Sequence, residues 1–207
     1  MIYYLDYFLK LKCAGDVLNT CYPIGNKPSK EITESMSVIR KLKKIVLKEP
    51  MKYTVYDLCA GNALTSVLAC YFLPIKGAIA IDKRTRSRRY HLAQRFRYEI
   101  RDIYNLSADE FVPHSIIIAI HACGKLSDRI IELYKSSENV EYLIMMPCCV
   151  GNIDYVKLPR AIEGLIDKYK AWVWNLAIKC GVNSFSFDRH CISPKNGIIV
   201  ASKKQGG

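Results

Sequence analysis

Three acidic residues follow three consecutive predicted strands, where their side chains could bind a ligand. Asp57 opens the small-residue turn at 59–63, Asp82 closes the next strand, and Asp102 lies at the end of the third. In doubly wound sheets, ligands bind beyond the carboxyl ends of the strands. A turn of small residues lets the backbone approach a ligand, and an acid after the second strand can accept hydrogen bonds from ribose hydroxyls. The pattern predicts a site for a ligand that carries a ribose.

Histidine and cysteine residues follow the next two predicted strands and recur in the closing loop: His121, Cys123, Cys148, Cys149, His190 and Cys191. Three chemistries are open to them. His121 is suited to accept a proton, because an unperturbed imidazole titrates near neutral pH. Four of the six could hold zinc, and Cys148 could attack a pyrimidine as a thiolate. Without a Cys-x₂₋₄-Cys pair we predict no metal, and we expect Cys123 and Cys149 to pack the strand ends.

A basic segment begins directly after Asp82. Residues 83–101 hold eight lysines and arginines and one acid, Glu99, in a chain with a net charge of +12. Such an excess favours polyanionic partners, and the guanidinium fork suits phosphate. We therefore expect Arg84 and Arg88 to contact nucleic acid; a solvated helix face is the alternative.

Apolar strands alternate with helical patterns along most of the chain, which predicts a parallel sheet covered on both faces. The last two strands have no helix between them, so one of them is expected to run antiparallel. The fold class is α/β: a doubly wound, mostly parallel Rossmann-like sheet with an antiparallel strand near the C-terminus. The expected strands are 52–58, 77–82, 97–103, 115–121, 140–146, 184–187 and 197–201, and the expected helices are 2–11, 31–46, 63–72, one from Lys83, 126–134 and 162–178.

Length and composition fit one domain with a short appendage. The chain has 207 residues, half of them apolar, and nine cysteines without regular spacing. An odd number of irregularly spaced cysteines favours reduced thiols, and hence the cytoplasm. No apolar run reaches the roughly 18 residues of a membrane span, so no membrane association is expected. Residues 1–30 form the appendage, which could face the substrate, and 31–207 form the main domain.

The turn and the two acids resemble the Rossmann-like S-adenosylmethionine-dependent methyltransferases. Their first motif reads roughly Asp-x-Gly-x-Gly-x-Gly; this chain keeps Asp57 and Gly61 but has Cys59 and Ala63 where glycine is usual. A dehydrogenase-type site would need Gly-x-Gly-x-x-Gly, which the turn lacks. The resemblance implies S-adenosylmethionine as cofactor, with Asp82 on the ribose and Asp102 on the adenine. The implied cofactor-binding residues are Asp57, Ala60, Gly61, Asn62, Asp82, Lys83, Asp102 and His121.

Two further motifs, at 121–128 and 147–151, resemble a narrower branch. His-x-Cys-Gly-x-x-Ser-Asp followed by Pro-Cys-Cys-Val-Gly is similar to the tRNA acceptor-stem 2′-O-methyltransferases and to the glutathione S-transferase C-terminal-domain-containing proteins. The likeness covers roughly residues 30 to 202. Val150 and Gly151 stand where the tRNA enzymes carry two histidines, and the N-terminal zinc-binding modules of those enzymes are absent from this sequence.

Together these resemblances imply a methyltransferase acting on RNA, with tRNA as a candidate and a ribose 2′-hydroxyl or a base as acceptor. His121 is the expected catalytic base and Asp128 the alternative proton acceptor. Arg84, Arg88, Cys148 and Cys149 are the expected substrate-binding residues. Two other functions stay open: a noncatalytic RNA-binding subunit that retains the fold, and a methyltransferase for a protein or a small molecule.

Overall fold

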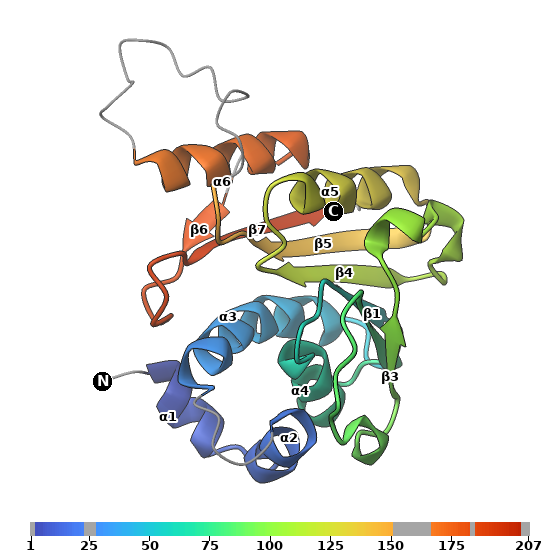
Figure 1. Ribbon diagram of the computed structural model, residues 1–207, viewed down its shortest axis with the longest axis vertical. Helices are drawn as coiled ribbons and strands as arrows, with labels where there is room; N and C mark the ends of the chain where they lie inside the picture. The colour runs from blue at the N-terminus through green and yellow to red at the C-terminus, as the bar shows by residue number, and fades with distance from the viewer. Residues whose placement is uncertain (1–2, 23–27, 151–166, 183–184, 204–207) are drawn as a thin grey trace.

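A seven-stranded mixed sheet forms the centre of the protein (Figure 1). The computed structural model describes residues 3–22, 28–150, 167–182 and 185–203. The strand order is β3-β2-β1-β4-β5-β7-β6. The first five pair in parallel, whereas β7 is antiparallel to both β5 and β6. The bounds are β1 (Thr54–Leu58), β2 (Gly77–Asp82), β3 (Phe96–Ile100), β4 (Ser115–Ile120), β5 (Val140–Met146), β6 (Phe185–Phe187) and β7 (Gly197–Ser202). The predicted fold class is confirmed, including the antiparallel strand near the C-terminus.

Helices cover both faces of this sheet. The helices on one face are α1 (Tyr3–Leu9), α2 (Ala14–Cys21), α3 (Ser29–Val46) and α4 (Leu64–Phe72), and those on the other are α5 (Lys125–Ser136) and α6 (Lys168–Lys179) (Figure 1). Three single 3₁₀ turns, η1 (Tyr90–Leu92), η2 (Ile103–Asn105) and η3 (Ala108–Glu110), complete the described elements. None of the described helices is long and apolar enough to cross a membrane.

Strand β4 shows why the middle of the sheet is so apolar. Ile116 and Ile118 pack into the core on the α3 and α4 side, whereas Ile117 and Ala119 pack into the core on the α5 and α6 side. All four side chains are fully buried. Because successive strand residues point to opposite faces, a strand covered on both faces needs apolar residues at every position. Burial on both faces fixes the position of the strand ends, and therefore the position of the residues that follow the strands at the edge of the sheet.

The predicted basic helix from Lys83 is wrong. Residues 83–89 form bends and irregular backbone, and the only regular structure before β3 is the 3₁₀ turn η1. Like charges three and four residues apart destabilise a helix, and this segment has a basic residue at most positions. The backbone N–H and side chain of Arg84 bond to Asp82 instead.

The ends of the chain differ in part from the expectations. The helix expected over 2–11 is present as α1, and the structure adds a second short helix, α2; the two pack on α3 and α4. The long helix expected over 162–178 is described only from Lys168, because 151–166 lie outside the described residues. In that helix Trp172 is buried in the core, whereas Trp174 is 56% exposed.

Candidate functional site

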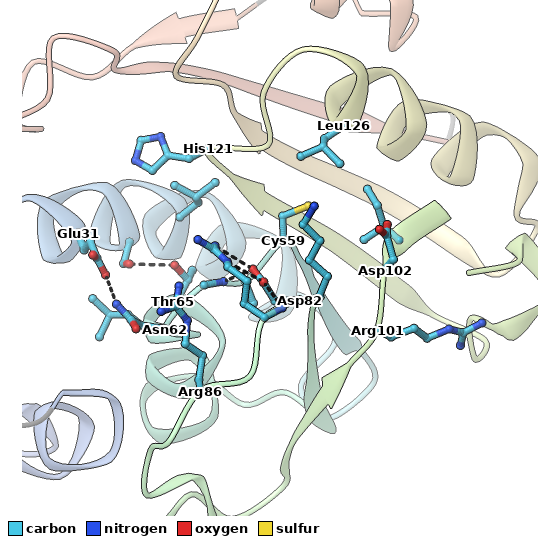
Figure 2. Close-up of a pocket in the computed structure, with 18 of the residues that line it drawn as sticks. Glu31, Cys59, Asn62, Thr65, Asp82, Arg86, Arg101, Asp102, His121 and Leu126 are labelled. Atoms are coloured by element: carbon cyan, nitrogen blue, oxygen red, sulfur yellow. Dashed lines mark hydrogen bonds and ion pairs between the residues drawn. The ribbon is translucent and has the colours of Figure 1, made fainter. Parts of the chain in front are cut away.

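A cavity of about 500 Å³ opens beyond the carboxyl ends of β1 to β4 (Figure 2). Gly61, Asp82, Asp102 and His121, each following a different strand, all line it. Its volume lies within the range of about 300–1,000 Å³ that is usual for small-molecule and cofactor sites. Four residues predicted from the sequence therefore meet at one edge of the sheet.

In the turn between β1 and α4, every second residue adopts the left-handed backbone conformation. Cys59 has φ of 61°, Gly61 of 56° and Ala63 of 55°. These are the three glycine positions of the family motif, and glycine enters this region without steric cost. Each non-glycine residue held there costs on the order of 1 kcal/mol or more, so this chain keeps the conformation of the motif at an energetic cost.

The buried carboxylate of Asp82 is fully hydrogen-bonded in this structure. Its Oδ1 accepts from the backbone N–H of Arg84 at 2.9 Å and from Arg84 Nε at 3.0 Å. Its Oδ2 accepts from the Gly61 N–H at 2.9 Å and from Arg84 Nη2 at 3.2 Å. A carboxylate offers about four lone-pair sites, so all of them are used. Burial raises the pKa of the Asp82 carboxyl, but the hydrogen bonds from Arg84 and Gly61 outweigh burial and hold the pKa below its ordinary value.

Asp57 lies beneath the turn and is not among the residues that line the cavity. Its carboxylate is 3% exposed and accepts a hydrogen bond from Ser66 Oγ at 2.7 Å. Burial raises the pKa of Asp57 to about 7, although the hydrogen bonds from Ser66 oppose the shift. The structure thus makes Asp57 a positioning residue that ties β1 to the start of α4, rather than a cofactor contact.

The remaining predicted cofactor-binding residues, Ala60, Asn62, Lys83 and Asp102, do line the cavity. Asn62 donates to Glu31 at 3.2 Å and accepts from Arg88 at 3.0 Å, so both ends of its amide are engaged. Asp102 caps the turn η2 through the N–H of Tyr104 at 3.1 Å. Burial raises the pKa of the neighbouring Cys59 thiol to about 12, and the charge of Asp82 adds to the effect. Cys59 therefore acts here as an uncharged wall.

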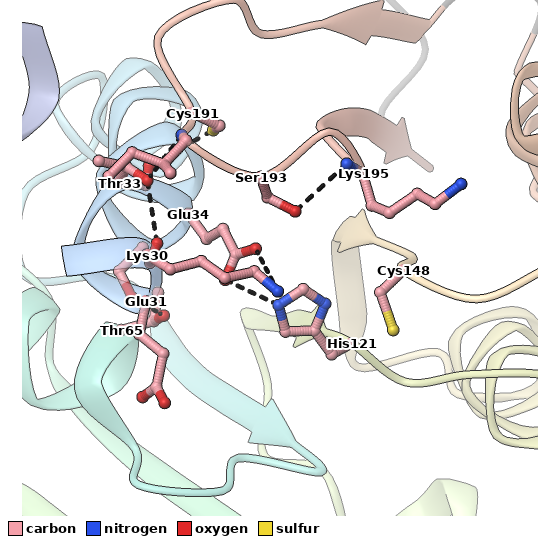
Figure 3. Close-up of polar contacts among 12 residues, drawn as sticks. Lys30, Glu31, Thr33, Glu34, Thr65, His121, Cys148, Cys191, Ser193 and Lys195 are labelled. Atoms are coloured by element: carbon pink, nitrogen blue, oxygen red, sulfur yellow. Dashed lines mark hydrogen bonds and ion pairs between the residues drawn. The ribbon is translucent and has the colours of Figure 1, made fainter. Parts of the chain in front are cut away.

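His121 is paired with a buried glutamate that the sequence did not single out. Its Nε2 lies 2.7 Å from Oε2 of Glu34, which reaches across from α3 and is 1% exposed (Figure 3). Lys30 Nζ lies 3.8 Å from Oε1 of the same carboxylate, but Glu34 Oε1 and His121 Nδ1 are both buried without a hydrogen-bond partner among the described residues. Buried polar atoms normally find partners. Two such atoms beside one cavity mark a site that a ligand completes.

The signal for Glu34 in the sequence is weak. Helical spacing of Ile32, Met36 and Ile39 predicts one apolar stripe on α3, yet every residue from 32 to 39 is buried. Two of the four polar side chains in this stretch, Glu34 and Ser35, line the cavity, and Ser35 Oγ lies 2.8 Å from Oγ1 of Thr65 on α4. The only feature of the sequence that indicates a role for Glu34 is the presence of an acidic residue within this apolar helical pattern.

Besides Asp57, four predicted residues lie outside the cavity lining: Arg88, Asp128, Cys148 and Cys149. Asp128 forms an ion pair with Lys179 at 2.6 Å, which joins α5 to α6 and gives Asp128 no place beside His121. Cys148 and Cys149 do not line the cavity either; their sulfur atoms are 3.3 Å apart. Together with Cys123 they form a cluster whose sulfur atoms all lie within 4.8 Å of one another. Hydrogen bonds from Cys148 and Cys149 lower the pKa of the Cys123 thiol to about 5.

The two other members of the predicted cluster lie elsewhere. His190 packs against the rings of Tyr3 and Tyr4, with ring centroids 4.9 and 5.4 Å apart. Cys191 is buried and donates to the carbonyl of Thr33. The structure therefore separates one predicted cluster into a His–Glu pair, a three-thiol cluster and two packing residues.

The cavity fits the cofactor that the resemblance implies. A Cβ added at Gly61 would meet only a terminal atom of the Arg84 side chain, at 3.9 Å, so the space next to the Gly61 backbone is open to a ligand. Asp82 supplies a buried carboxylate for two hydroxyl groups, and Asp102 lies at the end of the next strand over. These residues could hold an adenosine group, with Glu34 and His121 at the far end of the same cavity.

Comparison with solved structures finds similar methyltransferases, two of which share the fold at a TM-score of 0.50 or above. The structure is similar to magnesium protoporphyrin IX methyltransferase from Synechocystis, solved with S-adenosylhomocysteine, at 14% identity and a TM-score of 0.51 over 94% of each chain. It is similar to the methyltransferase domain of bacterial CtHen1, at 14% identity and a TM-score of 0.50 over 83% of this chain and 98% of that one. TrmK from M. capricolum, also solved with S-adenosylhomocysteine, covers 79% of this chain and 68% of its own at 12% identity and a TM-score of 0.49.

Comparison of the sequence with curated proteins gives no match. The model of the methyltransferase domain family matches residues 27–155, the stretch that carries β1 to β5 and every residue of the cavity. A match over more than half of the chain shows that this protein belongs to the methyltransferase domain family, as an enzyme that uses S-adenosylmethionine.

Proposed function

We propose that this methyltransferase acts on RNA, with tRNA as the candidate class and a ribose 2′-hydroxyl or a base as acceptor. The observation that carries the proposal is the position of the basic segment. Residues 83–89 run as irregular backbone from the end of β2 along the mouth of the cavity, and Lys83, Arg84 and Arg86 belong to its lining. A basic surface continuous with the cofactor cavity suits a phosphodiester chain better than it suits a small apolar molecule.

Ion pairs neutralise part of the basic stretch 83–101 and leave segment 83–89 as the main candidate for phosphate contact. Arg97 pairs with Glu99 at 2.6 Å and Arg101 pairs with Glu110 at 2.5 Å, so the basic residues of β3 and its end are locally neutralised. Lys83 is exposed, and Arg86 Nε has no hydrogen-bond partner among the described residues. Phosphate contact therefore rests on 83–89 rather than on the whole basic stretch.

The motifs shared with the tRNA acceptor-stem branch support the same substrate. The segment beginning with His121 and the Pro-Cys-Cys segment resemble motifs of that branch, and the N–H of His121 bonds to the carbonyl of Met146 at 2.9 Å. The two segments are thus adjacent at the ends of β4 and β5, beside the cavity. Val150 and Gly151 replace the two histidines of the tRNA enzymes, which leaves His121 as the imidazole at this edge.

The residues of the cavity can perform methyl transfer to a hydroxyl. S-adenosylmethionine supplies an electrophilic methyl group. The protein therefore has to bind the cofactor and the acceptor, align the acceptor hydroxyl with the methyl group, and remove the proton of that hydroxyl. Glu34 accepts the Nε2–H of His121, which fixes the ring and leaves Nδ1 as the proton acceptor. The carboxylate also stabilises the imidazolium that forms when Nδ1 takes the proton from the acceptor hydroxyl, as the carboxylate of a catalytic triad does.

RNA affinity is expected to fall with salt, and the slope is expected to depend on 83–89. Each phosphate neutralised on a single strand contributes about −0.7 to the log–log slope of affinity against salt. Replacing Arg86 and Arg88 together with alanine should flatten the slope by roughly one to two such contributions. The measurement is fluorescence titration of unfractionated tRNA at several salt concentrations. Arg84 is left unchanged because it also contacts Asp82.

A matched variant controls for loss of charge alone. Lys48 and Lys76 are exposed and lie before β1 and β2, at the opposite edge of the sheet. Replacing both with alanine removes the same charge and should leave the slope as in the wild type. A wild-type slope near zero, or equal slopes in the two double variants, would reject RNA as the substrate and favour a protein or a small molecule.

Loss of the Asp82 carboxylate is expected to weaken cofactor binding. Hydrogen bonds to a charged group are worth about 1.5–3 kcal/mol, so Asp82→Ala should lower affinity for S-adenosylhomocysteine roughly tenfold to a hundredfold. Isothermal titration calorimetry measures the change. Asp109, an exposed acid on η3 outside the cavity lining, provides the control through Asp109→Ala. Equal affinity in a folded Asp82→Ala protein would remove Asp82 from the cofactor site.

A further inference from the structure

The three-thiol cluster has the donor set of a metal site that the methyl-transfer chemistry does not use. Cys123 follows β4, and Cys148 and Cys149 follow β5, yet their sulfur atoms lie within 4.8 Å of one another. Two sulfur ligands of a tetrahedral zinc ion lie about 3.8 Å apart, because each Zn–S bond is about 2.3 Å long. The cluster therefore has the spacing of a zinc site before any ion is added.

Backbone contacts hold the two segments that carry these thiols in place, without help from contacts between the sulfur atoms. Strand pairing and the bond from His121 N to Met146 O, at 2.9 Å, join the two segments that carry them. On the other side, the hydroxyl of Tyr169 donates to the carbonyl of Pro147 at 2.8 Å and accepts from the N–H of Gly197 at 2.8 Å. Residue 147 is thus anchored to α6 and β7. A donor set that is already positioned loses little conformational freedom on binding a ligand.

The composition of the cluster selects the metal. All three donors are sulfur, and thiolates prefer Zn²⁺ and Cu⁺ to hard cations such as Mg²⁺. All nine cysteines of the chain that the structure describes are free thiols, so none of the three is consumed by a disulfide. Cys149 is exposed, which gives an ion a route in and leaves a fourth position for water. Adjacent cysteines rarely share one ion, but here a third thiol from the neighbouring strand completes the set.

We infer that Cys123, Cys148 and Cys149 bind one Zn²⁺ ion as thiolates, with water as the fourth ligand. Three Zn–S bonds form on binding, and each thiol that was protonated releases its proton to the buffer. The ion ties the loop after β5 to the loop after β4, directly beside His121.

The test uses the full chain, purified under reducing conditions and stripped with a chelator. Titration with Zn²⁺ alone in two buffers of different ionisation enthalpy should give one site and net proton release. Cys149→Ser should weaken binding by more than the roughly 100-fold that loss of a supporting hydrogen bond costs a metal site. Cys149 is exposed, so this change should not disturb the fold. Cobalt bound to the wild type should show a thiolate charge-transfer absorption band, and Cys149→Ser should weaken that band.

Cys13 provides the matched control, because it is a partly exposed free thiol on the far side of α3 and α4. Cys13→Ser should bind zinc as the wild type does, and S-adenosylhomocysteine titration should confirm that each variant is folded. The inference is overturned if the reduced wild type binds no stoichiometric zinc. It is equally overturned if Cys149→Ser and Cys13→Ser bind zinc alike. It is also overturned if the three thiols bind no zinc and their only observed reaction is formation of a Cys148–Cys149 disulfide on oxidation.

Discussion

His121→Ala is expected to lower kcat for methyl transfer roughly 10²- to 10⁴-fold, the usual loss when a general base is removed. Affinity for S-adenosylhomocysteine should change little, because the ribose and adenine side of the cavity is formed by other residues. The measurement is transfer of a tritiated methyl group to RNA, the proposed substrate, under saturating cofactor, together with calorimetric titration of the cofactor product.

Two further variants separate catalysis from structure. Glu34→Gln keeps the shape of the side chain but removes the charge that stabilises an imidazolium, so it should lower kcat and alter the pH profile of kcat without loss of folding. The control is His114, whose Nδ1 lies 2.5 Å from Oε1 of Glu141 at the opposite end of the same strands. His114→Ala breaks a similar His–Glu pair and should leave kcat unchanged. Full activity in His121→Ala would reduce His121 to a wall of the cavity.

Asp57→Asn is expected to stabilise the protein above pH 7. The native carboxyl has a pKa of about 7 against an ordinary value of 3.8. Below about pH 4 the group is protonated in both states, so it favours neither. Between the two pKa values only the unfolded chain ionises, and native stability falls as pH rises until it levels off above pH 7. A difference of about three pKa units corresponds to on the order of 4 kcal/mol.

Urea unfolding at pH 5 and pH 8 measures this effect as the difference between wild type and Asp57→Asn. The variant should gain most of its advantage at pH 8 and much less at pH 5. Ser66→Ala provides the converse change: it removes the side-chain hydrogen bond that lowers the pKa of Asp57, so the loss of stability should extend to higher pH and become larger in total, at the same slope of one proton. Parallel pH dependence in wild type and Asp57→Asn would show that Asp57 is ionised in the native protein at neutral pH.

The strands and the acids at their ends could be predicted because both depend on local sequence. A strand buried on both faces needs a continuous apolar run, as in β4 and β5, and the residue that ends such a run must lie at the sheet edge. Asp82 and His121 lie at the ends of such strands, whereas Asp102 follows β3, a partly exposed strand at the edge of the sheet; all three line one cavity. The position of Gly61 followed from the turn that links β1 to α4.

Contacts between distant side chains could not be predicted in the same way. Glu34 and His121 are 87 residues apart, and only the packing of α3 across the sheet end brings them within hydrogen-bonding distance. The Arg84 guanidinium lies on the Asp82 carboxylate because the segment after β2 is not helical, which the pattern of charges did not predict. The meeting of Cys123 with Cys148 likewise depends on the register of β4 against β5.

With RNA as the proposed substrate, the saturated carboxylate of Asp82 would couple cofactor binding to the binding of a substrate phosphate. Two of its four hydrogen bonds come from backbone N–H groups that the turn and the strand end hold in place, so the Arg84 guanidinium is the donor that gives way to a ribose. A phosphate that attracts Arg84 frees the carboxylate, and a ribose on the carboxylate frees Arg84. By reciprocity each ligand raises the affinity of the other by the same factor. Because the Arg84 side of this ion pair is 59% exposed and open to screening by salt, salt should help the cofactor compete for Asp82 while it weakens binding of the proposed RNA substrate.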